Sequence, residues 1–475
     1  MTRSFLFALL VVLGIGPASW AEEPTAAVRI LDVGPIRDID ALAPHLRWAA
    51  AHGWDAIRME LPHALDPSVS QSEPATTLLE VVELCEELEL TAMLQLFPEG
   101  SPRPRHPPDY GSRRDLRSLR NRIGRWIERA PLAEWSLSFR GGLAQHSRLG
   151  NGTLDLQPTH PKQLGLAAQV HADHPDVRLW VEPTHSTTES IATLDDDVRR
   201  QVLESWKRLP DSIGVIWAGP RLVNPSIERN EIEEARPLFG SRPMLLLDRF
   251  PDGYAATAHP LSLVLAPLSG RDPALVTMLD GYLSRPMGQL GGARLSLTTV
   301  AAFFEDPEGY DPQRAIERAV NRFVGKSSEA RDALRTQILE WGGAPGEHND
   351  ARFPANDERM AARSLRDPAR VARWRWTELR YPERMGKLTA LTDEAFRQDL
   401  LEAMSRRLAI ARAIPAAQQL RQRQTEPGQW ETAGKMLRTM QERLRERPLA
   451  LTSLVRFLRA AGLSDTVVEP RRTER

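Results

Sequence analysis

Short apolar runs alternate with amphipathic segments between about Ala26 and Val324. The runs that predict strands are 28–31, 56–59, 91–97, 135–139, 177–181, 213–217, 243–247 and 261–265. Segments with apolar residues at helical spacing follow the first five, at 39–51, 76–88, 115–130, 162–173 and 195–208. Eight strands over about 300 residues, alternating with helices, indicate an α/β fold of the (β/α)₈ TIM-barrel type. A doubly wound open sheet is the alternative that this pattern leaves open.

Beyond about Lys326 the strand pattern stops and only helical spacing continues. The helical segments are 330–341, 367–379, 393–414, 429–446 and 451–461. Their polar faces are rich in Arg, Glu and Gln, which is typical of an all-α helical bundle with solvated surfaces. A chain of 475 residues is expected to form more than one domain. We therefore expect a barrel over 26–325 and a helical C-terminal domain over 326–475.

The first residues have the pattern of a secretory signal peptide, which we assign to 1–21. Arg3 precedes an apolar run from Phe5 to Ile15, and small residues stand near Ala21 at the expected cleavage point. The run is too short to span a bilayer, so we expect no stable membrane span after cleavage. An uncleaved anchor is the alternative. The single cysteine, Cys85, cannot form an internal disulfide. These features favour an exported bacterial protein, periplasmic or secreted.

The charge of the chain is nearly balanced, with 62 Lys and Arg against 63 Asp and Glu and a formal net charge of −1. This balance argues against nucleic acid or an acidic membrane surface as the main partner. The histidines show no spacing with carboxylates or the cysteine that would predict a metal site. We find neither a glycine-rich phosphate loop nor a nucleophile elbow, and we expect no cofactor.

Four motifs in the predicted barrel resemble the catalytic barrel of glycoside hydrolase family 84, the β-N-acetylglucosaminidases that include protein O-GlcNAc hydrolases. The stretch from Gly281 to Pro312 is similar to the family's Gly-x-x-x-Asn-Pro-Met, helix, Asn-Pro-Glu-x-Tyr-Asp-Pro. The other three stretches are Val181 to Ser186, Pro210 to Val223 and Arg242 to Tyr254. Their common order and spacing imply shared ancestry and a (β/α)₈ barrel.

The resemblance also implies a catalytic mechanism that this sequence does not match. Family members use an Asp-Asp pair after the fourth strand, one residue to orient the substrate's acetamido group and one as general acid/base. Here the matching positions are Arg140 and Gly141. A guanidinium stays protonated near neutral pH and glycine has no side chain, so neither can serve as the acid or base. We therefore expect the ancestral activity to be absent.

Other ionisable residues lie at or just past the predicted strand ends, where barrel enzymes act. They are Asp32, Glu60, Glu99, Glu182, His185 and Asp248. Glu182 and Asp248 are the alternatives for relocated catalytic carboxylates. The structural interpretation, which we favour, is that the carboxylates bond loop amides or pair with the arginines Arg58, Arg140, Arg249 and Arg285.

Three arginines, Arg140, Arg249 and Arg285, match positions around the family's sugar pocket. They could bind an anionic sugar, phosphate or carboxylate, because guanidinium forks suit such groups. Alternatively they pair with nearby carboxylates and fill the pocket. Trp217 is predicted as a pocket wall or a core aromatic. The candidate ligand-binding set is Arg140, His185, Trp217, Asp248, Arg249 and Arg285.

We thus expect an exported, non-catalytic homologue of a β-N-acetylglucosaminidase. It would bind a glycan or anionic sugar, or act as a scaffold for another envelope protein. The alternatives are an active glycoside hydrolase that uses relocated carboxylates, and an interaction module that works through the helical C-terminal part.

Overall fold

The computed structural model describes 12 stretches and four single residues of the chain. They are 27–36, 38–61, 65, 72–98, 110–130, 132–139, 159–221, 224–251, 263–286, 290–341, 361, 365, 368–421, 427–444, 448–461 and 463. The predicted signal peptide over 1–21 therefore lies outside the described residues, and so do Arg140 and Gly141.

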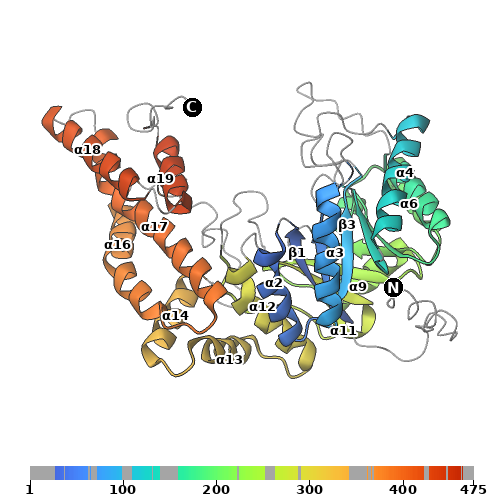
Figure 1. The fold of residues 1–475 in the computed structure, drawn as a ribbon, viewed down its shortest axis with the longest axis horizontal. Coiled ribbons are helices and arrows are strands. Elements are labelled where there is room, and N and C mark those ends of the chain that lie inside the picture. Colours follow the sequence, from blue (N-terminus) through green and yellow to red (C-terminus); the bar gives the residue numbers. More distant parts are fainter. Residues whose placement is uncertain are drawn as a thin grey trace, which may run out of the picture.

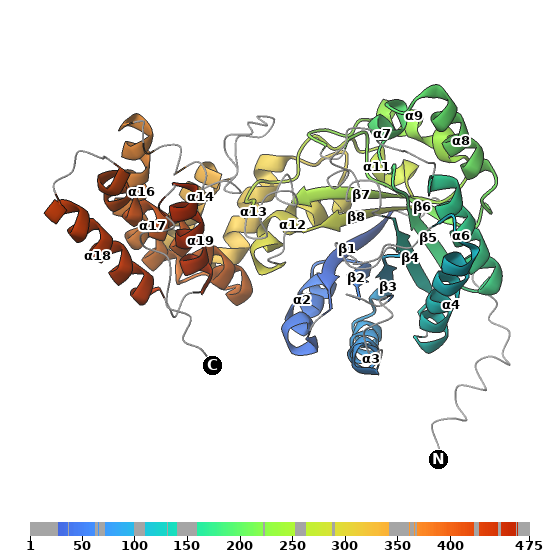
Figure 2. The ribbon, with the colours of Figure 1, turned by 90° about the horizontal axis from the view of Figure 1, so that it is seen from above.

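Eight parallel strands close into a barrel in chain order, β1 to β8 (Figure 2). They are β1 (Val28–Pro35), β2 (Ala56–Glu60), β3 (Thr91–Leu96), β4 (Glu134–Ser138), β5 (Arg178–Glu182), β6 (Gly214–Trp217), β7 (Met244–Pro251) and β8 (Gly281–Arg285). The ring is closed by pairing between β1 and β8, in which Val28 lies opposite Gly281. This arrangement confirms the predicted barrel and excludes the open sheet.

Helices cover the outside of the barrel (Figures 1 and 2). They are α2 (Ile39–Ala51), α3 (Ser72–Glu87), α4 (Arg113–Arg129), α6 (Thr159–Asp173), α7 (Thr188–Ala192), α8 (Asp196–Lys207), α9 (Arg229–Phe239), α11 (Leu275–Met278) and α12 (Leu290–Glu305). Side-chain caps fix several starts: Asp38, Ser112 and Asp195 each accept a hydrogen bond from a first-turn amide. The acidic run at Asp195 is thus a helix start.

The eighth strand differs from the sequence prediction. The apolar run 261–265 was expected to be a strand, but residues 263–269 have no regular secondary structure and β8 is Gly281–Arg285. Leu263 and Leu265 are nevertheless fully buried. Two backbone carbonyls of this segment, those of Val264 and Ala266, accept hydrogen bonds from the hydroxyl of Ser296 in α12. An apolar run next to a buried helix can therefore resemble a strand in sequence.

The barrel has an inner and an outer apolar layer. The inner cluster is built from strand residues, including Ile30, Met93 and Trp180, and from Ala218 directly after β6, while the outer cluster joins strands to helices. Trp180 fills the interior so closely that a Cβ at Gly214 would lie 2.1 Å from its ring. Glycine on β6 is what leaves room for this indole.

A helical region follows the barrel, with α13 (Pro312–Val324), α14 (Ser328–Trp341), α16 (Pro368–Leu388), α17 (Glu394–Arg421), α18 (Pro427–Arg443) and α19 (Pro448–Ala460). The first half of α17, with Phe396 and Leu400, belongs to the main core of the barrel. Its second half, from Ile410, packs with α18 and α19 in a separate cluster. Gly291 and α17 touch so closely that a Cβ there would meet the Ala395 carbonyl at 2.5 Å. Among the described residues, no helix is long and apolar enough to cross a membrane.

Candidate functional site

A buried guanidinium, Arg58, lies at the centre of the barrel's carboxyl end. It projects from β2 and its side chain is fully buried. One amino group donates to Asp32 Oδ2 of β1 at 2.5 Å, and the other to Glu182 Oε2 of β5 at 3.3 Å. Arg58 of β2 thereby joins β1 to β5 across the barrel interior. A charge buried this deeply requires such partners.

Neutral polar side chains complete this network between Arg58 and the carboxylate of Glu182. Ser138, at the end of β4, donates its hydroxyl to Glu182 Oε2 at 2.7 Å. Gln95 of β3 donates its amide to the Ser138 hydroxyl at 2.6 Å and to Glu182 Oε2 at 3.3 Å. One oxygen of Glu182 therefore accepts from three side chains. Such a set of donors holds the carboxylate in one position.

Asp32 is held in its charged form. Burial alone would raise the pKa of its carboxyl, but the Arg58 and Arg285 guanidiniums and the amide of Gly34 outweigh this, so the pKa lies below its ordinary value. Arg285 approaches from the end of β8, with Nε 3.9 Å from Asp32 Oδ2. A carboxyl that stays ionised at neutral pH cannot donate a proton as a general acid.

Charged groups remain partly open to solvent only at the rim of this network. The side chain of Glu182 is 14% exposed and that of Arg285 27%, whereas Arg58 and Asp32 are buried. We use the name barrel-mouth network for Asp32, Arg58, Gln95, Ser138, Glu182 and Arg285. It can offer a carboxylate and a guanidinium to a polar ligand.

Asp248 does not join the barrel-mouth network. Its neighbours Met244 and Leu246 belong to the outer core, and Asp248 shares their side of β7. Arg271 Nε and Nη2 donate to its two oxygens at 2.7 and 3.0 Å, and the Tyr282 hydroxyl donates at 2.6 Å. These partners are buried between the strands and the outer helices.

Arg271 also explains why this buried ion pair exists. Its guanidinium donates to the carbonyls of Asn224, Pro225 and Ser269, so it joins the loops that follow β6 and β7. The role of the Asp248 ion pair is thus to hold backbone together. Glu182 and Asp248, the two carboxylates that the sequence offers as a relocated pair, lie on opposite sides of the sheet.

The remaining predicted ligand-binding residues fall in different places. Trp217 is fully buried in the outer core and donates its indole N–H to the Thr188 hydroxyl at 3.2 Å, so it lines no interior pocket. His185 follows β5 and Arg249 lies within β7, and both are partly exposed. Arg140 and Gly141 lie outside the described residues, directly beyond the end of β4.

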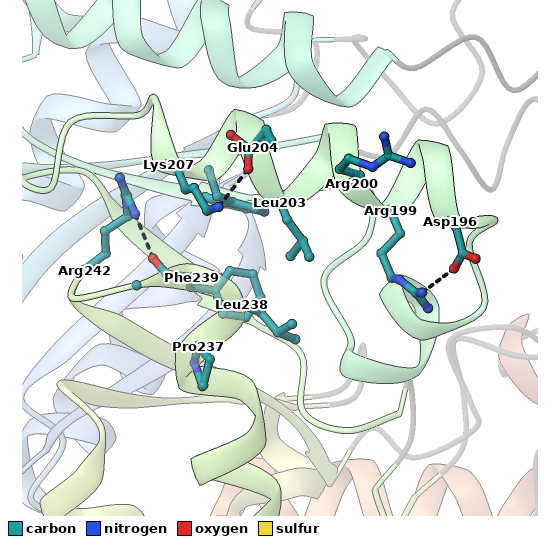
Figure 3. A pocket seen from close by; sticks show the side chains of 12 residues that line it. Asp196, Arg199, Arg200, Leu203, Glu204, Lys207, Pro237, Leu238, Phe239 and Arg242 are labelled. Atoms are coloured by element: carbon teal, nitrogen blue, oxygen red, sulfur yellow. Dashed lines mark hydrogen bonds and ion pairs between the residues drawn. The ribbon is translucent and has the colours of Figure 1, made fainter.

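A hollow of about 730 Å³ lies elsewhere, on the outer wall between α8 and α9 (Figure 3). It is lined by Leu203, Trp206 and Phe239 together with several charged side chains. The charges are largely paired, as in the contacts of Arg199 with Asp196 and of Lys207 with Glu204. This hollow is lined by outer-wall residues and lies away from the barrel-mouth network.

Comparison with known proteins finds a family model that matches part of the chain. Residues 165–338 match the family model described as beta-N-acetylglucosaminidase, from within α6 to near the end of α14. The match covers the second half of the barrel and the first helices that follow it. In its fold the chain is similar to a point mutant of the O-GlcNAc hydrolase of Thermobaculum terrenum, with a TM-score of 0.58 and 17% identity, over 94% of this chain and 96% of that one.

A second similar structure is CpGH84B, with a TM-score of 0.58 and 12% identity, over 90% of this chain and 76% of that one. At these identities, the likeness shows a shared fold. In barrels of this type, active sites lie at the carboxyl ends of the strands. The barrel-mouth network occupies that end.

From the sequence, Arg58 is predicted only as a pairing partner for carboxylates, and Gln95 and Ser138 are not predicted as site residues. These two residues have apolar neighbours along their strands, as in Leu94-Gln95-Leu96 and Ser136-Leu137-Ser138. Polar residues at alternate positions of a barrel strand could have indicated an inward polar layer. Among the described residues, no group of three or more His, Cys, Asp or Glu could hold a metal ion.

Proposed function

We propose that this chain is an exported, non-catalytic β-N-acetylglucosaminidase relative that binds GlcNAc-containing glycans at the mouth of its barrel. The observation that carries the proposal is the commitment of the interior carboxylates. Asp32 and Glu182 both contact the buried Arg58, and the pKa of Asp32 is lowered. Acid/base catalysis would need a carboxyl that exchanges its proton near neutral pH.

The sequence at Arg140 and Gly141 supports the same proposal. These residues stand at the positions of the family's Asp-Asp pair, where neither side chain has a carboxyl group. The choice of a GlcNAc-containing glycan follows the family and the named activity of the Thermobaculum terrenum relative. Export is supported by the apolar run from Phe5 to Ile15 and the small residues near Ala21.

Binding would use the partly exposed rim of the barrel-mouth network. Glu182 can accept hydrogen bonds from sugar hydroxyls, and Arg285 can donate to ring or acetamido oxygens. Because Ser138, Gln95 and Arg58 restrain Glu182, little side-chain entropy is lost when a ligand binds. The rigid network is therefore suited to holding a sugar without reacting with it.

The test is isothermal titration of the full chain with GlcNAc oligosaccharides, beside a turnover assay on aryl β-N-acetylglucosaminide. We expect measurable binding and no turnover. Glu182→Gln and Arg285→Met should each weaken binding by about tenfold, which is about 1.4 kcal/mol. Arg178→Met is the matched control, since Arg178 pairs with Glu134 at the opposite end of the barrel. Turnover, or equal effects of all three substitutions on binding, would overturn the proposal.

A further inference from the structure

The outer helix α4 concentrates positive charge that the chain as a whole does not have. Its 17 residues contain seven arginines against Asp115 and Glu128, a net charge of +5, whereas the full chain has a net charge of −1. Helix α4 is therefore strongly basic although the chain as a whole is nearly neutral. A local field of this kind can recruit a polyanion even when the net charge is close to zero.

The arginines of α4 gather on its solvent face because the opposite face is core. Leu119, Ile123, Trp126 and Ile127 are buried against the barrel. The arginines that are exposed to solvent are Arg113, Arg114, Arg117, Arg125 and Arg129, which we call the α4 stripe. At 100° per residue these five positions fall on one side of the helix.

Most of the α4 stripe is not used by the fold. The two other arginines of α4 have partners in the fold: Arg120 pairs with Asp173, and Arg122 donates to the Leu65 carbonyl. No hydrogen bond or ion pair joins Arg113, Arg114, Arg117 or Arg125 to any other described residue. Unneutralised guanidiniums held in a row by a helix repel one another, so an anion bound along them would lower the free energy.

The stripe runs the whole length of the helix. From Arg113 to Arg129 the helix rises about 24 Å, at 1.5 Å per residue. Its first residues stand at the carboxyl end of the barrel, because α4 follows β3, and its last stand at the opposite end (Figures 1 and 2). A ligand along the stripe would thus extend down the outer wall from the side on which the barrel-mouth network lies.

The surroundings of the stripe limit what can bind there. The exposed positions of α4 carry only charged or polar side chains, and its one aromatic residue, Trp126, is buried. There is accordingly no exposed apolar group to enter a bilayer and no ring for bases to stack on. The preceding helix on the wall, α3, exposes Glu80, Glu83, Glu86 and Glu87. A flat anionic membrane would meet these glutamates, whereas a thin anionic strand can follow α4 alone.

We propose that the α4 stripe binds an acidic polysaccharide, a single glycan strand that carries carboxylate groups along its length. Guanidinium forks pair with carboxylates in a bidentate geometry, and several weak pairs in a row add up along a polymer. The choice of a glycan among thin polyanions rests on the proposed function. The basic stripe itself is independent of it.

The experiment measures binding of the full chain to polygalacturonate, with single-stranded DNA and anionic phosphatidylglycerol vesicles as competing polyanions. The test variant is Arg113→Gln/Arg117→Gln/Arg125→Gln. The matched control is Arg314→Gln/Arg318→Gln/Arg322→Gln, which removes three exposed arginines from α13. We expect the test variant to raise Kd for polygalacturonate by about tenfold or more and the control to leave it nearly unchanged. Affinity should fall as salt is raised.

The results of this experiment distinguish the α4 inference from the proposed function. Equal losses in the two triple variants, or no binding of polygalacturonate, would overturn the α4 inference. Tighter binding of DNA or vesicles would also overturn it, in favour of those partners. Neutral GlcNAc oligosaccharides test the barrel mouth separately, and their binding should be unchanged in the α4 variant. If they bind while polygalacturonate does not, the proposed function stands and the α4 inference falls.

Discussion

Replacing Arg58 by methionine should destabilise the barrel strongly, and the loss should depend on pH. Methionine fills much of the same volume but leaves Asp32 and Glu182 without their shared guanidinium. Asp32 is 3% exposed and its pKa is lowered mainly by Arg58 acting against burial. Removal of one partner from a buried ion pair typically costs about 3–5 kcal/mol, because the remaining charge is buried without compensation. We expect a loss in this range at pH 7.

The pH dependence follows from the sign of the shift in the Asp32 pKa. In the native protein the lowered pKa contributes stability above the unfolded value near 3.8, and this stability is lost as pH falls through the folded pKa. Between pH 7 and 5 the contribution of Asp32 to wild-type stability is therefore constant. In Arg58→Met burial dominates and raises the carboxyl pKa, so the variant recovers stability as pH falls through the raised value.

Urea unfolding of the full chain at pH 7 and 5, followed by tryptophan fluorescence, measures both effects. Arg29→Met is the matched control, since Arg29 pairs with the half-exposed Asp55 on the outside of the same barrel. Loss of such a pair typically costs about 0–1 kcal/mol. The reasoning is refuted if Arg58→Met costs no more than Arg29→Met. It is also refuted if the cost of Arg58→Met is equal at the two pH values.

Three further changes test the packing around the site by the same unfolding measurement. Gly214→Ala should lower the free energy of unfolding by about 1–3 kcal/mol, because its Cβ would overlap the Trp180 ring. Adding Trp180→Phe should restore part of this loss. No effect of Gly214→Ala on stability would contradict the described packing. Tyr282→Phe should cost about 1–3 kcal/mol, since it removes a buried hydroxyl that donates to Asp248 at 2.6 Å, and should leave glycan binding unchanged. Asp399→Ala should cost about 0.5–2 kcal/mol by removing the acceptor for a first-turn amide of α12, whereas Asp399→Asn should cost less.

The barrel was accessible from sequence because its strands and helices have different apolar periods. The first seven strands stand where the apolar runs predict them. The eighth was assigned to 261–265 because a buried loop and a buried strand are equally apolar. The true strand, Gly281–Arg285, has only Tyr282 and Leu283 as large apolar residues. Two such residues are a weak signal for a strand.

The sides of the strands were harder to predict than the strands themselves. Strands of a parallel barrel are buried on both faces, so a run such as Met244 to Leu247 has no polar alternation that marks the inner side. Asp248 and Trp217 were therefore considered for the barrel mouth, although the structure buries them toward the outer helices. The contact between Arg58 and Glu182 joins residues 124 apart in the chain and has no local sequence signal.

The central claim is that this barrel binds a glycan without cleaving it. The most direct measurement is the hydrolysis of aryl β-N-acetylglucosaminide by the purified wild-type chain and by Glu182→Gln, with the Thermobaculum terrenum hydrolase as positive control. We predict that both forms release aryl alcohol at the buffer rate under conditions in which the control enzyme is active. Wild-type turnover that Glu182→Gln abolishes would contradict the claim, because it would show a working carboxylate in the barrel-mouth network.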